Sequence, residues 1–189
     1  MSFFKTLNNK SGTSRKNSNN NNNNNKSSKQ KIYNLTFYAI FVCLSVALSF
    51  LESLVPLDFI APGVKIGLAN LSTVFLIRQD KFLGAVGVNA TRILLSALLF
   101  SGFSSLPFSV CGAILSFLVM FLMQKFKIFS GAGISAAGGF MHNLGQIIVS
   151  LLFVPVSVLK YFPFLGLAGI FTGTVIGILT DICIKRLKK

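Results

Sequence analysis

Long apolar stretches that contain almost no charge dominate this chain and point to the hydrocarbon core of a membrane as its solvent. Hydrophobic residues make up 52% of its 189 residues and charged residues 12%, whereas a soluble domain has about 25% charged residues. A helix that crosses a bilayer needs about 20 apolar residues. Six stretches approach that length, at about residues 35–51, 61–77, 82–100, 108–123, 131–154 and 164–184. We therefore expect an all-α integral membrane protein, a six-transmembrane-helix bundle over residues 32–189.

The second stretch is the weakest of the six. Pro62, Gly63 and Lys65 interrupt its start, and proline and glycine oppose a regular helix. About twelve uninterrupted residues remain, too few to cross the hydrocarbon. We therefore expect this segment to begin as a re-entrant or broken helix.

The first 31 residues have a different composition from the rest of the chain. They hold an unbroken asparagine run at residues 19–25, several serines and seven of the 18 basic residues. A segment with so little apolar surface to bury is expected to stay disordered. The first apolar stretch begins only at Leu35, too late for a cleaved signal peptide, so we expect it to be retained as a span.

The basic residues outside the spans are distributed unevenly between the two sides of the membrane. If the tail is cytoplasmic, fifteen of the 18 basic residues fall on that side, Lys65 and Lys160 fall outside, and Arg92 lies within the membrane. Because Lys and Arg favour cytoplasmic connections, we expect a multi-pass protein of the cell membrane with both termini in the cytoplasm. Basic residues clustered between apolar runs do not resemble a nucleic-acid-binding face, which excludes nucleic acid as the main partner.

Few side chains of this chain are suited to catalysis. It contains four acidic residues, one histidine and three separated cysteines, and these cannot easily supply paired carboxylates or a metal-ligand cluster. We therefore expect binding or transport rather than an enzyme, with no metal and no cofactor.

Two groups of polar residues occur in the middle of apolar stretches, where polar side chains are costly and commonly functional. Asn89, Arg92 and Ser96 share one helix face in the third stretch. Arg92 either contacts an anionic part of a ligand or pairs structurally, with Glu52 as the acid within reach from the end of the first stretch. His142, Asn143 and Gln146 lie together in the fifth stretch. They either bind a heteroaromatic or amide-bearing ligand or serve helix packing.

The connection from Glu52 to Asn70 is too apolar for a loop that lies idle in water. Its prolines and glycines prevent a continuous helix, so we expect it to fold back over the outer mouth of the bundle. It acts either as a lid, with Lys65 at its edge, or as a passive cap.

Small residues recur at helical spacing and allow helices to approach closely in lipid. Gly166, Gly169, Gly173 and Gly177 form such a stripe in the sixth stretch, and glycines of the third and fifth stretches, Gly84 and Gly87 among them, extend the tendency. We expect these glycines to pack helices inside the bundle. A second stripe, Ala39, Cys43 and Ala47 in the first stretch, leaves a groove for another helix, either of this chain or of a partner protein.

The segments 52–56, 62–70 (PGVKIGLAN), 92–94 and 142–146 resemble the bacterial Gx transporter family, which is also catalogued as heptaprenyl diphosphate synthase component I. That family is similar to the substrate-binding S components of energy-coupling factor (ECF) vitamin transporters. The resemblance covers about residues 33–185, and the PGVKIGLAN run is its most specific part.

The resemblance implies an S-component-like fold in a bacterial inner membrane, with an outward-opening pocket under the loop between the first two spans. It implies that the small-residue stripe docks on a transmembrane coupling protein, although Cys43 replaces the more usual alanine. Separate ATPase subunits would supply energy, because this chain has no Gly-x-x-x-x-Gly-Lys-Ser/Thr phosphate-binding loop. The substrate-binding residues expected from the residues and the resemblance together are Glu52, Lys65, Asn70, Asn89, Arg92, His142, Asn143 and Gln146.

Two functions follow from these observations. The first is a substrate-binding membrane subunit that moves a vitamin-like or flavin-like molecule with separate coupling and ATPase subunits. The second is the noncatalytic membrane component of a heptaprenyl or polyprenyl diphosphate synthase. Catalysis by this chain alone is disfavoured because Asp58, Asp80 and Asp181 are isolated, whereas such enzymes hold magnesium with paired Asp-rich motifs.

Overall fold

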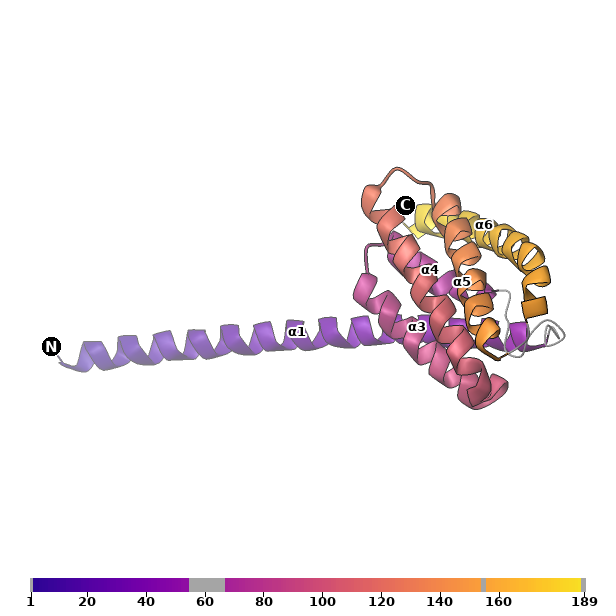
Figure 1. Ribbon diagram of the computed structural model, residues 1–189. Coiled ribbons are helices and arrows are strands. Elements are labelled where there is room, and N and C mark those ends of the chain that lie inside the picture. The colour runs from indigo at the N-terminus through magenta and orange to yellow at the C-terminus, as the bar shows by residue number, and fades with distance from the viewer. Residues whose placement is uncertain (1, 55–66, 154–155, 188–189) are drawn as a thin grey trace. The chain divides into compact units, whose positions relative to one another are not determined.

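The computed structural model describes residues 2–54, 67–153 and 156–187, with side chains from residue 27 onward except that of residue 158. Within these residues every regular element is helical (Figure 1). The elements are α1 (Ser2–Ser53), η1 (Leu68–Asn70), α2 (Leu71–Arg78), α3 (Phe82–Ser96), η2 (Ala97–Ser101, a π-helical turn), η3 (Phe103–Ser105), α4 (Leu106–Phe126), α5 (Gly131–Phe153), η4 (Val156–Tyr161) and α6 (Phe162–Leu187).

Five of these helical segments are long and apolar enough to cross a bilayer. They cover Ser27–Ser53, Phe82–Ser101, Phe103–Phe126, Gly131–Phe153 and Leu159–Leu187, and the second apolar stretch forms only the shorter helix Leu68–Arg78. The all-α, six-helix membrane fold is therefore confirmed, with a shortened second helix as its proline and glycine content predicts. Residues 61–66, where that stretch was expected to begin, lie outside the described residues.

The chain divides into two units, residues Met1–Ala39 and Ile40–Lys189. In the first unit, α1 continues back through the asparagine-rich tail to Ser2, whereas composition predicts disorder there. The side chains of residues 27–36 are exposed. The second unit contains the helical bundle.

Helix α2 is enclosed on all sides. Its residues from Ser72 to Ile77 are buried, and it contacts α3, α4 and α6. The part of α1 in the second unit also reaches it, since the rings of Phe41 and Phe75 stack at 4.9 Å and Ser72 Oγ donates to the Phe41 carbonyl at 3.1 Å. A helix too short to span the hydrocarbon is tolerated when protein surrounds it, and the apolar sequence of α2 suits that position.

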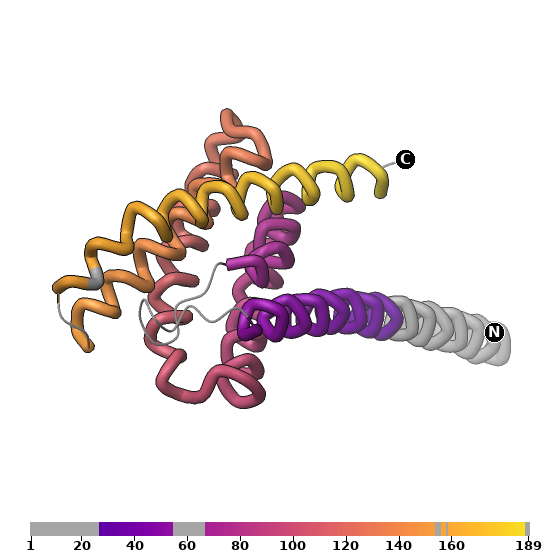
Figure 2. The backbone as a smooth tube through the Cα atoms, turned by 90° about the vertical axis from the view of Figure 1, so that its right-hand side faces the viewer, coloured from indigo at the N-terminus to yellow at the C-terminus, as the bar shows by residue number. Residues whose placement is uncertain are grey.

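Helices α4, α5 and α6 pack side by side in chain order (Figures 1 and 2). Glycines allow the closest contacts: a Cβ on Gly169 would lie 2.6 Å from the Gly139 carbonyl oxygen, and one on Gly177 would lie 2.5 Å from Ala132 Cα. The prediction that the glycine stripe of α6 packs inside the bundle is therefore confirmed. It was wrong for Gly87 in α3, where an added Cβ would have no atom within 4 Å, because that side of α3 faces outward.

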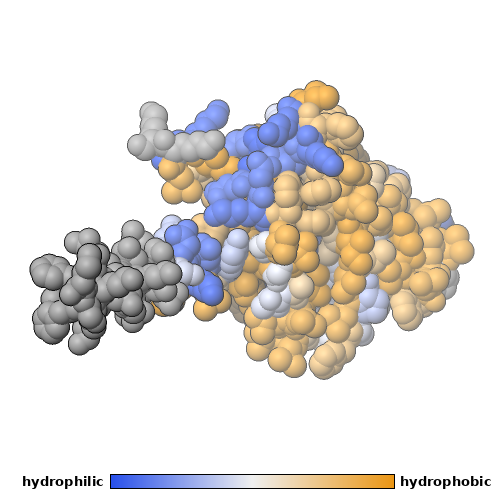
Figure 3. All heavy atoms as spheres, turned by 90° about the vertical axis from the view of Figure 1, so that its left-hand side faces the viewer, coloured by the Kyte–Doolittle hydropathy of each residue, from blue (hydrophilic) through white to orange (hydrophobic). Residues whose placement is uncertain are grey.

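Charged residues meet at one end of the bundle. Arg78, at the end of α2, pairs with Asp181 of α6 at 3.0 Å and donates to Gln124 of α4 at 3.1 Å. Gln124 in turn donates to Asp80 at 3.2 Å. Figure 3 shows a patch of hydrophilic residues on a face that is otherwise mostly hydrophobic.

Candidate functional site

A cluster of buried polar residues occupies the interior of the bundle and contains most of the site residues expected from the sequence. Each of its members has at most 6% of its surface exposed. We call this group the polar cluster; its members are Glu52 (α1), Asn70 (η1), Asn89 and Arg92 (α3), Ser116 (α4), and His142 and Gln146 (α5). Five elements thus contribute to one interior, which is unusual for the core of a membrane protein unless those residues serve a function.

The short segment Gly67–Asn70 connects the parts of the polar cluster. Gly67 adopts φ +98°, a left-handed conformation that suits glycine, and the turn it makes places Ala69 and Asn70 against different neighbours. The Ala69 N–H donates to Glu52, and Asn70 Nδ2 donates to Ser116 Oγ at 3.0 Å. A Cβ on Gly67 would lie 3.8 Å from Cδ2 of His142. The last residues of the PGVKIGLAN run thus meet three other helices, α1, α4 and α5.

Glu52 closes the last turn of α1 and faces the start of the buried second helix. Its Oε1 accepts the N–H of Ala69 at 3.3 Å. The first N–H groups of a helix have no partner within the helix and carry partial positive charge. The carboxylate therefore satisfies a donor that would otherwise be buried in apolar surroundings.

Arg92 lies on α3 with 5% of its surface exposed. Its Nη2 donates to Asn89 Oδ1 at 2.8 Å, one helical turn away, and the charge of Glu52 is near enough to act on it. Structural pairing of Arg92 with Glu52, and contact of Arg92 with a ligand, both stay predictions. The Nε of Arg92 has no hydrogen-bond partner among the described residues, so the guanidinium still has donor capacity.

His142 and Gln146 lie on the same face of α5. The Nε2 atoms of the two side chains share a hydrogen bond of 3.0 Å. Gly112 of α4 lies against the imidazole, since a Cβ there would come within 3.0 Å of two ring atoms. The close approach of α4 and α5 fixes the orientation of the ring toward the interior.

Asn143 is buried but turns to a different neighbour. Its Nδ2 donates to the Leu165 carbonyl of α6 at 2.6 Å, and its side chain packs against Gly169. One residue of rotation along α5 separates it from the face of His142. Asn143 therefore joins α5 to α6, and its sequence neighbour His142, not Asn143 itself, makes the hydrogen bond to Gln146.

The family model for heptaprenyl diphosphate synthase component I matches residues 41–183. The chain belongs to this family. No curated protein and no solved structure matches it.

In this member of the heptaprenyl diphosphate synthase component I family, the small-residue stripe faces outward. Ala39, Cys43 and Ala47 are exposed, whereas Ser45, Ser49 and Glu52 on the opposite face of α1 are buried. A groove of about 460 Å³ runs along the outer face. Its lining consists of Val42, Cys43, Val46, Ala47, Phe50, Leu95 and Phe100. The lining of this groove includes no residue of α2, α4, α5 or α6, and docking of another helix on the stripe stays a prediction.

Two expectations for this family member fall on residues outside the described ones. Lys65 and most of the Glu52–Asn70 connection belong to residues 55–66, so the lid remains a prediction.

Within the described residues, no group of three His, Cys, Asp or Glu side chains is placed to hold a metal ion.

Sequence reasoning missed two features of the site in this family member. Ser116 was not singled out, because a lone serine is common in membrane helices; its position opposite Asn70 depends on the packing of α4 against η1. The network of Arg78, Gln124, Asp80 and Asp181 was also missed. The sequence signal for this network was that Asp80 and Asp181 lie near the ends of spans and close to basic residues.

Proposed function

We propose that this protein is the substrate-binding membrane subunit of a transporter for a small, vitamin-like or flavin-like molecule, and that it works with separate coupling and ATPase subunits. The observation that carries the proposal is the polar cluster, in which donors and acceptors from five elements converge inside an apolar bundle. Small-molecule sites typically combine a mostly apolar wall with a few placed polar groups.

The polar cluster offers a mixed set of hydrogen-bonding groups. Asn70 Oδ1 is a buried acceptor and Arg92 Nε a buried donor, and neither has a partner among the described residues. An unmet buried polar group costs free energy, and a ligand with both donors and acceptors would recover it. His142 and Gln146 supply a flat ring and an amide beside them, a combination that suits a heteroaromatic or amide-bearing molecule.

The charge balance of the polar cluster limits which ligands it can bind. Glu52 opposes Arg92, so the described residues of the site carry no net charge. A ligand with a carbonyl or a partial negative charge at Arg92 fits this arrangement better than a multiply charged anion.

Ligand copurification tests the binding role. The protein is purified in mild detergent, and the small molecules it retains are identified by mass spectrometry. Gln146→Met keeps the side-chain volume but removes the amide, and should reduce ligand yield about fivefold or more, because a lost hydrogen bond is worth about 1 kcal/mol. Ser135→Ala, a buried change elsewhere on α5, serves as the control. Equal yields from both variants would contradict the proposed site.

Copurification with a coupling subunit tests the transporter role. Ala47→Leu fills the outer groove of α1 and should weaken recovery of the complex, because helix association in lipid depends on close packing. Thr91→Leu adds a similar side chain at an exposed position of α3 and should leave recovery unchanged. If both variants recover the complex as wild type does, the stripe is not the docking surface.

A second function is favoured by the family match itself, whose description names a synthase component. In that case the chain would assist an Asp-rich prenyltransferase without catalysing the reaction, because Asp181 and Asp80 are already engaged with Arg78 and Gln124. Copurification of a prenyltransferase in place of the coupling and ATPase subunits would favour this alternative.

A further inference from the structure

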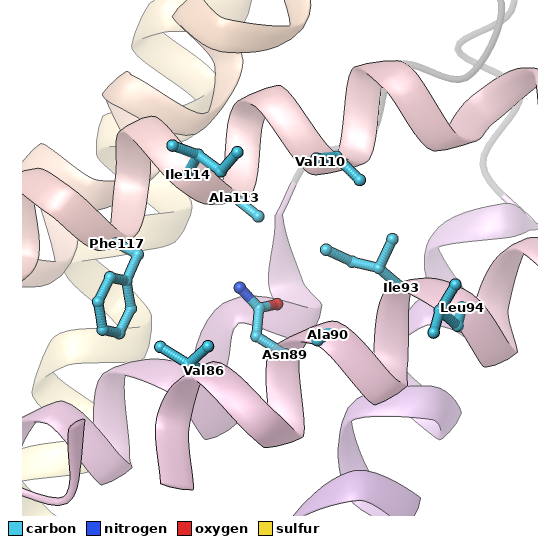
Figure 4. Close-up of a pocket in the computed structure, with 9 residues that line it drawn as sticks. All are labelled: Val86, Asn89, Ala90, Ile93, Leu94, Val110, Ala113, Ile114 and Phe117. Atoms are coloured by element: carbon cyan, nitrogen blue, oxygen red, sulfur yellow. The ribbon is translucent and has the colours of Figure 1, made fainter. Parts of the chain in front are cut away.

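A pocket of about 340 Å³ lies between α3 and α4, apart from the interior of the polar cluster. Its lining residues are Val86, Asn89, Ala90, Ile93, Leu94, Val110, Ala113, Ile114 and Phe117 (Figure 4). Eight of these nine side chains are apolar, and Asn89 is the exception. Ala90 and Ala113 are small, so the two helices leave space between them at this level. We call this space the lateral pocket.

The lateral pocket opens sideways, toward the lipid. Val86, Leu94, Val110 and Ile114 at its rim are 50%, 63%, 42% and 59% exposed, and both helices belong to segments long enough to span the bilayer. Leu94, Val110 and Ile114 lie away from the ends of these segments, and Val86 lies one turn inside the start of the first. A molecule would therefore enter the pocket from the hydrocarbon rather than from water.

Asn89 gives this apolar pocket one polar group. The side chain is 6% exposed, and Figure 4 shows its amide directed from α3 into the space between the helices. Its Oδ1 accepts from Arg92, which orients the amide and leaves Nδ2 as the donor. Among the described residues Nδ2 has no acceptor. An amide donor in an apolar pocket favours a ligand that supplies a hydrogen-bond acceptor.

The depth of Asn89 in the bilayer decides which molecules with a hydrogen-bond acceptor can reach it. The third span covers Phe82–Ser101, so Asn89 lies about 4 Å from its midpoint at the rise of an α-helix. The ester carbonyls of phospholipids lie near the edge of the hydrocarbon, about 15 Å from its centre. Lipid carbonyls thus do not reach Asn89. An anion is also disfavoured, because charge is costly at this depth and Glu52 already opposes Arg92.

We propose that the lateral pocket binds a neutral, apolar molecule that carries a carbonyl group and enters from within the bilayer. The apolar body contacts the aliphatic walls and Phe117, and the carbonyl oxygen accepts a hydrogen bond from Asn89 Nδ2. Asn89 is the only residue that the lateral pocket shares with the polar cluster. The site is therefore additional to the one proposed for the transported substrate.

Benzophenone is a suitable probe because it is a neutral aromatic ketone. On irradiation its carbonyl oxygen takes a hydrogen atom from a neighbouring C–H group, and the two resulting carbon radicals join to form one C–C bond. The full chain in phosphatidylcholine nanodiscs is irradiated with benzophenone, and adducts are mapped by mass spectrometry. Saturable labelling should concentrate in residues 86–94 and 110–117. Fluorenone should compete about fivefold better than fluorene, which has a similar shape but no carbonyl.

Variants separate the carbonyl contact from simple filling of the space. Asn89→Leu should abolish the preference for fluorenone, and Ala90→Phe, which leaves the Asn89–Arg92 bond intact, should remove labelling of the lateral pocket. Thr91→Val changes an exposed residue of the same helix and should leave both results unchanged. Labelling spread evenly over all exposed helices, or equal competition by fluorene and fluorenone in the wild type, would overturn the proposal. Neither readout requires a transported substrate, so failure here is distinct from failure of the proposed function.

Discussion

Arg92 is a buried cation whose charge is opposed from within the protein. Glu52 acts on it from α1 and Asn89 accepts one of its hydrogen bonds. Glu52 also accepts the Ala69 N–H, so one carboxylate stabilises both the guanidinium and the start of the buried second helix. The two charged residues therefore depend on each other, and removing either one leaves a charge inside the bundle.

A double-mutant cycle should reveal this dependence. Arg92→Gln alone should lower the free energy of unfolding by roughly 3–5 kcal/mol, because it leaves Glu52 charged and buried. The double variant Glu52→Gln with Arg92→Gln should recover a large part of that loss, since no charge remains. Unfolding in mixed micelles with increasing sodium dodecyl sulfate, followed by circular dichroism, gives the required free energies.

An exposed charge provides the comparison. Lys125→Gln at the exposed end of α4 should change the free energy of unfolding by about 0.5 kcal/mol or less. Strictly additive effects of the Glu52 and Arg92 changes would contradict a coupled pair and favour Arg92 as a ligand contact alone.

For single residues, the sequence predicts which polar side chains are buried in the bundle. It predicts less well which of them contact one another. Mid-span Asn89, Arg92, His142 and Gln146 can be selected because polar groups are rare in apolar stretches, and all four are buried. Their partners depend on tertiary structure. The placing of Glu52 beside Ala69, for example, requires the turn at Gly67, and no helical period predicts that contact.

At the scale of elements, glycine determines how closely α5 and α6 approach. A Cβ on Gly169 would meet both the Gly139 carbonyl oxygen and Asn143 Nδ2 at 2.6 Å. These atoms cannot move without displacing the backbone of α5 or breaking the Asn143 bond to Leu165. The glycine stripe thus sets the helix spacing on which the orientation of α5, and with it His142, depends.

Gly169→Ala should therefore destabilise the protein by about 1–3 kcal/mol, as overpacking does in a closely packed core. Gly87→Ala is the matched change in α3, where no atom lies within 4 Å of the added methyl group. It should be neutral or stabilising by about 1 kcal/mol or less, because alanine favours the helix. Equal effects of the two substitutions in the same unfolding assay would show that helix propensity, not packing, decides the outcome.

The extents of the elements follow from local sequence, whereas their surroundings do not. Apolar stretches near 20 residues predict the long helices, and Pro62 and Gly63 predict the shortened second one. Gly87 and Gly169 both occur in glycine-containing stretches, yet one faces outward and the other a neighbouring helix. Which face of a membrane helix is inside cannot be read from hydrophobicity when lipid and protein interior are equally apolar.

At the scale of the whole molecule, the ends of three connections form one polar surface. The ion pair of Arg78 with Asp181, and the bonds from Gln124 to Arg78 and Asp80, bring together the α2–α3 turn, the end of α4 and the end of α6. Lys81, Lys125, Lys127, Lys185 and Arg186 belong to the same connections and helix ends. The uneven distribution of basic residues is therefore a property of the folded bundle and not of the sequence alone.

The positive-inside rule then predicts that this surface faces the cytoplasm and that Lys160, in the η4 turn, faces the outside. Single cysteines test the orientation in a background from which Cys43, Cys111 and Cys183 have been removed. Gln124 is a poor reporter because it is buried and hydrogen-bonded to Arg78 and Asp80, so Lys125→Cys takes its place. An impermeant maleimide added to intact cells should label Lys160→Cys at once and Lys125→Cys only after permeabilisation. Labelling of Lys125→Cys in intact cells would require the opposite orientation, with the basic surface outside and against the charge preference of the membrane.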